Sequence, residues 1–127
     1  MHADQRRFDE LSGKVIGCAF EAANTLGRGF VEKIYANALA NELQRQGISV
    51  KREYPVKVFY KGDLVGEFFC DLLIEELIIV ETKATSGLNN LHMAQCLNYL
   101  KATGFKLCLL FNFGMPSVQH KRIVNKF

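Results

Sequence analysis

Several features that would assign a chain to a special structural class are missing from this sequence. Its 127 residues include only 2 prolines, with no low-complexity tract, internal repeat or proline-rich linker. No apolar run approaches the roughly 20 residues needed to span a membrane, and the N-terminal stretch lacks the apolar segment of a signal peptide. We therefore expect a soluble chain without a membrane partner, folded as a single domain over residues 1–127.

Paired cysteine motifs are absent as well. The four cysteines are widely separated, with no CxxC pair and no histidine at zinc-finger spacing: Cys18, Cys70, Cys96 and Cys108. This spacing argues against an iron-sulfur cluster or a structural zinc site. Each cysteine has apolar neighbours, which is typical of small core residues in a reducing compartment. The prediction is a cytoplasmic protein whose cysteines belong to the core.

A strong charge imbalance is also lacking. The net charge is +3, from 16 Lys and Arg against 13 Asp and Glu. The basic pairs Arg6-Arg7, Lys51-Arg52 and Lys121-Arg122 are typical of a solvated surface. Charge is compatible with a polyanionic partner, but by itself it does not predict nucleic-acid binding.

What the sequence does contain begins with two helical patterns. Apolar residues recur every three or four positions from Phe8 to Leu26, which predicts an amphipathic helix that Gly27 and Gly29 end. A second helix is predicted from about residue 30 to residue 46, with Gly47 as its stop.

The second helix carries an acidic residue on an otherwise apolar stripe, formed by Glu32, Tyr35, Leu39 and Leu43. Glu32 lies in the predicted first turn, where its charge favours the positive end of the helix dipole. A carboxylate on an inward stripe is also a candidate site residue. The sequence leaves both interpretations open.

Strands follow the helices. The stretch VKREYPVKVFYKGDLVGEFF is rich in Val, Phe and Tyr and is divided by Lys61-Gly62-Asp63, which predicts a hairpin. The next stretch, LLIEELIIVE, fits a helix or two strands by periodicity. The β-branched run from Ile78 to Val80 favours strands joined by a tight turn at Glu75-Glu76. Counting back from that turn places Asp71 opposite residues 77–80, with Glu81 about 3 to 7 Å further along.

Alternation along the second of these strands places Glu81 and Lys83 on one face. Mg²⁺ prefers oxygen ligands and keeps several waters, so the Asp71 and Glu81 carboxylates could hold one ion beside a phosphate. Lys83 could orient a water or stabilise charge on that phosphate. Glu32 could complete the ligand shell or hold a metal-bound water. An acid followed by ExK is a weak pattern, however, and a same-face ion pair would explain it without a site.

The last third of the chain predicts a helix and two strands. Asn89 or Asn90 can cap a helix that runs to about residue 102. Gln95 and Tyr99 are four residues apart, so they share a helix face and could contact a phosphate backbone. The apolar run at 105–113 predicts a buried strand parallel to the one containing Glu81, and residues 119–124 a short last strand. The predicted class is α/β, a mixed sheet flanked by helices.

These motifs together resemble the GxxExxY proteins of the PD-(D/E)xK nuclease superfamily. The naming motif is GFVEKIY at residues 29–35, the superfamily motif is matched by Asp71, Glu81 and Lys83, and the QxxxY of RecB-like nucleases by QCLNY at 95–99. The closing LLFNFG at 109–114 is also similar. The likeness extends from about residue 11 to residue 124. Cys70 stands where the motif's name has proline.

The resemblance implies a restriction-endonuclease-like αβββαβ core with Asp71, Glu81 and Lys83 as catalytic residues and Glu32 as an accessory acid. It implies a Mg²⁺ cofactor, with Mn²⁺ as the alternative, held by Asp71, Glu81 and Glu32. The expected activity is hydrolysis of DNA, with RNA as the alternative substrate and Gln95 and Tyr99 contacting it. Cutting both strands at once would require a homodimer. The alternative function is a non-catalytic module that binds nucleic acid or protein and retains the nuclease fold.

Overall fold

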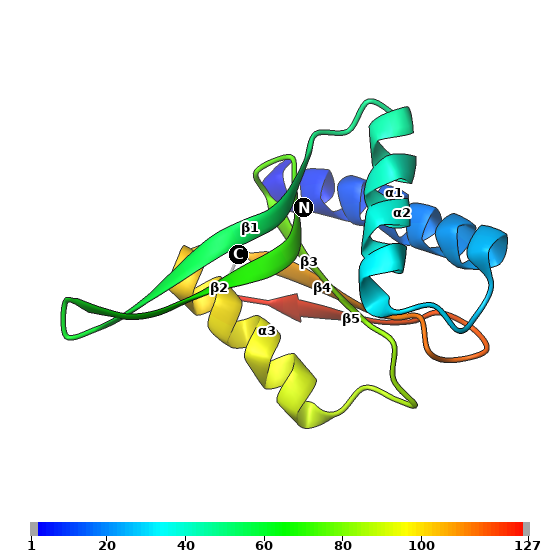
Figure 1. Ribbon diagram of the computed structural model, residues 1–127. Helices are drawn as coiled ribbons and strands as arrows, with labels where there is room; N and C mark the ends of the chain where they lie inside the picture. The colour runs from blue at the N-terminus through cyan, green and yellow to red at the C-terminus, as the bar shows by residue number, and fades with distance from the viewer. Residues whose placement is uncertain (1–2, 126–127) are drawn as a thin grey trace.

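The computed structural model describes residues 3–125 as a sheet with helices on both faces (Figure 1). The elements are α1 (Ala3–Leu26), α2 (Glu32–Arg45), β1 (Val50–Tyr60), β2 (Asp63–Ile74), β3 (Ile78–Lys83), α3 (Asn90–Thr103), β4 (Leu107–Asn112) and β5 (Gln119–Val124). Within these residues five strands form one sheet in the order β1-β2-β3-β4-β5. Strands β3 and β4 are parallel, and the other neighbours are antiparallel. The predicted α/β mixed sheet is confirmed, and so is its short last strand.

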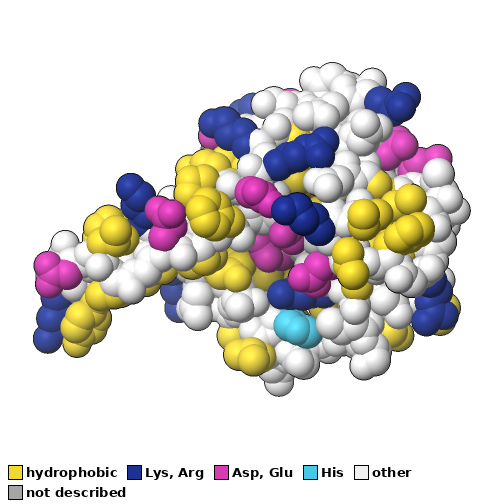
Figure 2. Space-filling model, in the orientation of Figure 1, with side chains coloured by type: hydrophobic (Ala, Val, Ile, Leu, Met, Phe, Trp, Pro, Cys, Tyr) yellow, Lys and Arg dark blue, Asp and Glu magenta, His cyan; other side chains and the backbone are white. Residues whose placement is uncertain are grey.

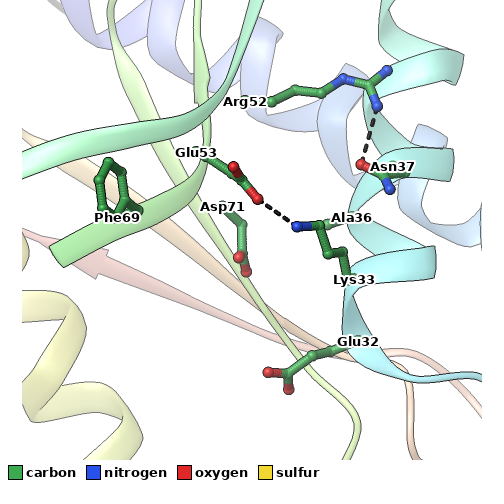
Figure 3. A pocket seen from close by; sticks show the side chains of 8 residues that line it. All are labelled: Glu32, Lys33, Ala36, Asn37, Arg52, Glu53, Phe69 and Asp71. Atoms are coloured by element: carbon green, nitrogen blue, oxygen red, sulfur yellow. Dashed lines mark hydrogen bonds and ion pairs between the residues drawn. The ribbon is translucent and has the colours of Figure 1, made fainter.

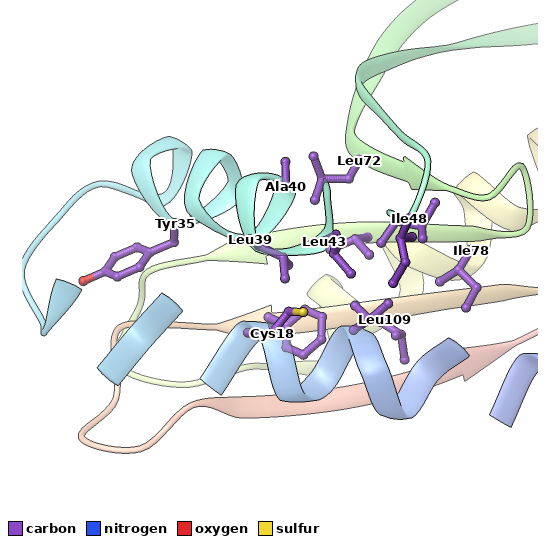
Figure 4. Close-up of a cluster of buried hydrophobic side chains, with 14 of the residues drawn as sticks. Cys18, Tyr35, Leu39, Ala40, Leu43, Ile48, Leu72, Ile78 and Leu109 are labelled. Atoms are coloured by element: carbon purple, nitrogen blue, oxygen red, sulfur yellow. The ribbon is translucent and has the colours of Figure 1, made fainter. Parts of the chain in front are cut away.

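Helices α1 and α2 cover one face of the sheet and form the larger core with it (Figures 1 and 4). Val15 and Leu39 from the two helices meet Val80 of β3 and Leu109 of β4 in this cluster. The spacing of three and four residues in both helices therefore predicted the buried side correctly, because these positions line one side of a helix. Each helix has one apolar side that packs on the sheet and an outer side that remains exposed.

Helix α3 covers the opposite face. Leu100 of α3 packs with Ile79 of β3 and Leu110 of β4, and the same cluster contains three of the cysteines, Cys70, Cys96 and Cys108. All four cysteines are buried and unpaired, as predicted. Because β3 is covered on both faces, its sequence is a continuous apolar run rather than an alternation, which is why periodicity could not distinguish strand from helix there.

The connection between β2 and β3 corrects one prediction. Glu75 and Glu76 have φ angles of 52° and 56°, and the amide of Leu77 donates to the carbonyl of Ile74 at 2.9 Å. Leu77 thus belongs to the turn, and Ile74 pairs with Ile78. The same register continues through Leu72 and Val80. Asp71 therefore lies directly across from Glu81, and the predicted offset of about 3 to 7 Å was wrong because it assumed a shorter turn.

Strands β1 and β2 extend beyond the body as a long hairpin, called here the arm (residues 57–67; Figure 1). Its turn is Lys61-Gly62, with φ angles of 50° and 87°, a left-handed pair that suits the twist of a two-residue hairpin. Figure 2 shows the arm as a narrow projection with hydrophobic side chains along it. The predicted hairpin is confirmed, and most of its side chains are exposed.

Helix α3 has a complete signal at each end. The side chain of Asn89 accepts a hydrogen bond from the amide of His92 at 2.9 Å, and His92 Nδ1 accepts from the amide of Asn89 at 3.3 Å. Gly104 ends the helix with a φ of 82°. Asn89, rather than Asn90, is the cap. Within residues 3–125, no helix combines the length and the apolar character that a membrane crossing would require.

Candidate functional site

Two carboxylates meet where β2 and β3 separate. Regular pairing ends at Leu72 and Val80, and beyond it the Asp71 amide donates to Glu81 Oε1 at 3.0 Å. In the opposite direction the Thr82 amide donates to Asp71 Oδ2 at 2.7 Å, and the Thr82 hydroxyl donates to the same oxygen at 2.8 Å. The two acids thus accept the backbone hydrogen bonds that carbonyl groups would accept in a continued ladder. This reciprocal pattern fixes both side chains and brings the predicted Asp71–Glu81 pair together.

Glu81 is almost fully buried, with 6% of its surface exposed. Burial, and then the adjacent Asp71 carboxylate, raise the pKa of Glu81 to about 8, while the Asp71 amide and the Lys83 ammonium oppose this shift. Two neighbouring acids in a region of low polarity repel each other when both are ionised, and a bound cation would relieve that repulsion. The oxygen donors here therefore fit a hard divalent ion, which uses one or two protein carboxylates and several waters.

Lys83 is the last residue of β3 and is half-buried. Its ammonium makes no direct ion pair or hydrogen bond with another of the described residues, although its charge acts on Glu81. A lysine of this kind is available to an incoming anion. Its backbone is fixed, because the amide of Phe113 donates to its carbonyl at 2.8 Å.

The segment after Lys83 is held by the end of β4. Asn112 is fully buried; its Oδ1 accepts from the amides of Thr85 and Gly114, both at 3.0 Å, and its Nδ2 donates to the Thr85 carbonyl at 3.1 Å. A Cβ at Gly114 would lie 2.5 Å from the Thr85 amide nitrogen and 2.7 Å from the Ala84 carbonyl carbon. These contacts give the LLFNFG stretch a physical role. The sequence signal was its family likeness, which did not show that Asn112 and Gly114 hold the segment directly after Lys83.

Glu32 is the first residue of α2 and is exposed. It lines a cavity of about 620 Å³ together with Asp71, and Figure 3 shows its side chain projecting from the start of the helix on the side toward which Asp71 points. The Glu32 carboxylate makes no hydrogen bond to another described residue. Val31 supplies no side-chain cap, so the negative charge of Glu32 also favours the helix start. Both interpretations drawn from the sequence are compatible with this position.

Tyr35 explains the rest of the GFVEKIY motif. Its ring is buried and stacks on Phe113, with centroids 4.6 Å apart and planes 5° from parallel. Its hydroxyl donates to the carbonyl of Gly27 and accepts from the amide of Phe30 at 3.4 Å. Tyr35 therefore fixes the loop between α1 and α2, and with it the direction in which Glu32 leaves the helix.

The same cavity contains a carboxylate that sequence reasoning missed. Glu53 lies in β1 with a φ of 52°, an uncommon conformation for a residue other than glycine, and forms an ion pair with Lys33 (Figure 3). Arg52 donates to Asn37 at 3.0 Å on the same wall. A left-handed backbone inside a strand leaves no pattern in the sequence, so no signal could have identified Glu53.

The described residues contain no cluster of three His, Cys, Asp or Glu side chains arranged to hold a metal ion. Asp71 and Glu81 are together, whereas Glu32 lines the cavity without joining them. The structure therefore brings together two of the three expected metal ligands.

Tyr99 and Gln95, the predicted substrate contacts, line a groove between α3 and the arm. Tyr99 is half-buried and packs on Phe68, with ring centroids 4.2 Å apart. Burial, and then the charge of the nearby Glu81, raise the pKa of Tyr99. Tyr99 is therefore close to the paired acids. Gln95 is exposed and lines the same groove as Tyr99.

Comparison with known proteins agrees with this architecture. The crystal structure of SSO0001 superposes with a TM-score of 0.59 at 16% identity, covering 76% of this chain and 51% of that one. An alkaline exonuclease (LHK-Exo) from Laribacter hongkongensis gives a TM-score of 0.49 at 14% identity, covering 68% and 52%. The chain thus spans about half the length of either protein. At these identities the first likeness supports the fold alone.

No curated protein matches the sequence. The sequence model of the PD-(D/E)XK nuclease superfamily, in contrast, matches residues 9–123, which extend from within α1 into β5 and include all the elements between them. That range contains the paired acids and the lysine at the point where β2 and β3 separate. The chain belongs to the PD-(D/E)XK nuclease superfamily.

Proposed function

We propose that this chain is a Mg²⁺-dependent nuclease that hydrolyses phosphodiester bonds in DNA, and that within its superfamily it belongs to the GxxExxY group. The observation that carries the proposal is the reciprocal pairing of Asp71 and Glu81 beside Lys83, whose ammonium has no ion pair among the described residues. A structural ion pair would bring the lysine directly onto an acid. Here the two acids instead face each other, which is costly without a cation.

Asp71 and Glu81 would hold the ion directly, and Glu32 would act through a metal-bound water, since it lines the cavity at a distance from the pair. Mn²⁺ is the alternative ion. When bound, such an ion lowers the pKa of a water and neutralises charge on the phosphate. Asp71 retains Oδ1 without a hydrogen bond from another described residue, so one oxygen is available as a ligand. Lys83 would stabilise negative charge that develops on the scissile phosphate.

Gln95 and Tyr99 would contact the backbone of the substrate on the α3 side, where both line the groove. The alternative substrate is RNA, which the same metal chemistry can cleave. A chain with one such centre would act as a homodimer where both strands of a duplex are cut together.

The test compares wild type with Lys83→Ala on a mixture of linear duplex, single-stranded and gapped DNA, with Mg²⁺, with Mn²⁺ and with EDTA. We expect cleavage with the divalent ions and none with EDTA. Loss of a charge that stabilises the transition state should lower the rate about 100-fold or more. Thermal unfolding of the variant should match wild type, since the Lys83 side chain makes no hydrogen bond or ion pair with any other residue between positions 3 and 125.

Lys14→Ala on α1 is the matched control, because Lys14 is an exposed lysine on the opposite side of the sheet. Equal cleavage by wild type and Lys83→Ala would contradict the proposed chemistry. Metal-independent DNA binding without cleavage of any substrate would favour the alternative function, a non-catalytic module with a nuclease fold.

A further inference from the structure

The groove between the arm and α3 is a second hollow, distinct from the cavity beside Glu32. It measures about 620 Å³. Its walls include Lys57 and Phe59 from the arm, Phe68 from β2 at the base of the arm, and Gln95, Tyr99 and Lys101 from α3. These six residues come from three elements, β1, β2 and α3, which meet where α3 packs against the sheet. Gln95 and Tyr99 belong to a known motif, and the other four have no assigned role.

The charge of the groove has one sign. Lys57 and Lys101 are exposed, they lie on opposite walls, and none of the residues that line the groove is acidic. Glu67 lies across the ladder from Lys57, but the two do not form an ion pair. In the cavity beside Asp71, by contrast, Lys33 is paired with Glu53. The groove therefore presents ammonium groups that are free to contact phosphates.

The groove also presents an aromatic surface. Phe59 is 61% exposed. Phe68, stacked on Tyr99, continues the aromatic lining inward. An exposed aromatic ring beside unpaired lysines is the combination that binds single-stranded nucleic acid, because each unpaired base offers a flat face for stacking. In a duplex those faces are already stacked on neighbouring bases, so the ring gains little from it.

The inner end of the groove lies close to the paired acids. Phe68 precedes Asp71 by three residues on β2, which corresponds to roughly 10 Å along a strand. The influence of the Glu81 and Asp71 charges on the Tyr99 hydroxyl indicates the same proximity. A strand lying in the groove would therefore reach the carboxylates at one end and the tip of the arm at the other.

We propose that this groove binds an unpaired segment of nucleic acid, with Lys57 and Lys101 on its phosphates and Phe59 stacked on a base. The inference rests on the proposed function insofar as the bound strand leads to the Asp71–Glu81 site. What the inference adds is the form of the substrate, which has at least one single-stranded portion. The arm and α3 bind that portion before a phosphodiester bond is cut.

Binding is measured by fluorescence anisotropy in metal-free buffer, using the Lys83→Ala chain so that nothing is cleaved. The probes are labelled 20-mers: oligothymidylate, oligouridylate and a blunt duplex. Oligothymidylate or oligouridylate should bind more tightly than the duplex. Phe59→Ala should weaken single-strand binding between about 5-fold and 150-fold, the usual loss for one stacked base. Phe59→Tyr, which keeps the ring, should restore it.

Tyr60→Ala is the matched aromatic control, since Tyr60 is the neighbouring residue, is 62% exposed and does not line the groove. For charge, Lys57→Ala with Lys101→Ala should reduce the slope of log affinity against log salt by about 1.4, the value for two phosphate contacts on a single strand. The charge-matched pair Lys14→Ala with Lys121→Ala should leave that slope unchanged.

Equal affinity for duplex and single strand would overturn the inference, as would a Phe59→Ala chain that binds like Tyr60→Ala. An equal slope for the two lysine pairs would overturn it too. Cleavage by the wild-type chain, assayed separately, tests the proposed function. Groove binding without cleavage would contradict the proposed nuclease function and support the groove as a single-strand binding site. Cleavage with no effect of Phe59→Ala would support the nuclease function and contradict the groove.

Discussion

At the scale of single residues, Glu81 determines how the candidate site responds to pH. The folded chain raises the pKa of this carboxyl from an ordinary value of 4.5 to about 8, chiefly by burial and then through Asp71. Between these two values the unfolded chain has Glu81 ionised while the folded chain keeps it protonated. Unfolding therefore releases a proton, and rising pH favours the unfolded state over this window.

The first prediction follows from this sign. Without metal, wild type should lose stability from pH 5 to pH 8, by on the order of a few kcal/mol from this group. Glu81→Gln keeps an oxygen to accept the Asp71 amide but does not titrate, so it should be the more stable chain at pH 8. Urea denaturation at both pH values measures the difference.

Glu67→Gln is a suitable control, because Glu67 is an exposed acid on the neighbouring strand β2. That variant should follow the wild-type pH profile. If Glu81→Gln also showed the wild-type pH profile, the pKa of Glu81 would not be raised in the folded protein. Both carboxylates would then be ionised together without a measurable loss of stability, and their repulsion would give no argument for a bound cation.

Alternation along a strand predicted that Glu81 and Lys83 share one face, and the family resemblance selected both, with Asp71, as the catalytic set, which stays a prediction. The sequence could not place Asp71 across from Glu81, since that depends on whether Leu77 belongs to the turn or the strand. The strained backbone of Glu53 likewise depends on its surroundings in the folded sheet. Which side chains converge is decided by tertiary geometry, and one residue of turn length changes it.

At the scale of elements, the end of β4 fixes the segment that follows β3 through side-chain hydrogen bonds. Asn112 replaces backbone partners for Thr85, and Gly114 allows the two segments to approach closely. The sequence identified both strands from their composition, because each is a short apolar run between turn signals and β3 begins with β-branched residues. It could not predict this contact, since a glycine after a strand usually indicates no more than a turn.

The second prediction concerns Gly114→Ala. The added methyl group would clash with backbone atoms of Ala84 and Thr85, so we expect a loss of about 1 to 3 kcal/mol of stability and slower cleavage as Lys83 is displaced. Gly13→Ala is the control, because Gly13 lies within α1 with open space around it and should gain about 0.5 to 1 kcal/mol. Urea denaturation and cleavage rates measure both. Equal stability of Gly114→Ala and wild type would show that the segments after β3 and β4 can move apart without a loss of folding free energy.

At the scale of the whole molecule, the body and the arm differ in how they are held. Two buried clusters on opposite faces of the sheet stabilise the body, and neither includes a residue between Val58 and Gly66. The arm is thus a two-stranded extension whose side chains at the tip contact solvent. Its length was evident from the sequence, but its projection from the body was not, because Val, Phe and Tyr usually indicate a strand that is at least partly covered.

The third prediction is that the arm can be shortened without unfolding the body. Replacing residues 59–65 with Asn-Gly would join Val58 to Gly66, which already pair, through a favoured two-residue turn. The midpoint of thermal unfolding should change by only a few degrees, because the buried clusters remain intact. Single-strand binding should weaken as Phe59 is removed. A large fall in the midpoint would mean that the arm folds as part of the body.

The crossed hydrogen bonds of Asp71 and Glu81 also affect how a relative of this chain that has lost nuclease activity could be recognised from its sequence. Each acid accepts a backbone hydrogen bond from the neighbouring strand. A related chain that no longer cut nucleic acid would therefore still need both acids to hold β2 and β3 together. The Lys83 side chain makes no such hydrogen bond within the part of the chain that the structure describes. The presence of the two acids therefore says little about whether such a chain is still active, and the lysine is the residue to inspect first.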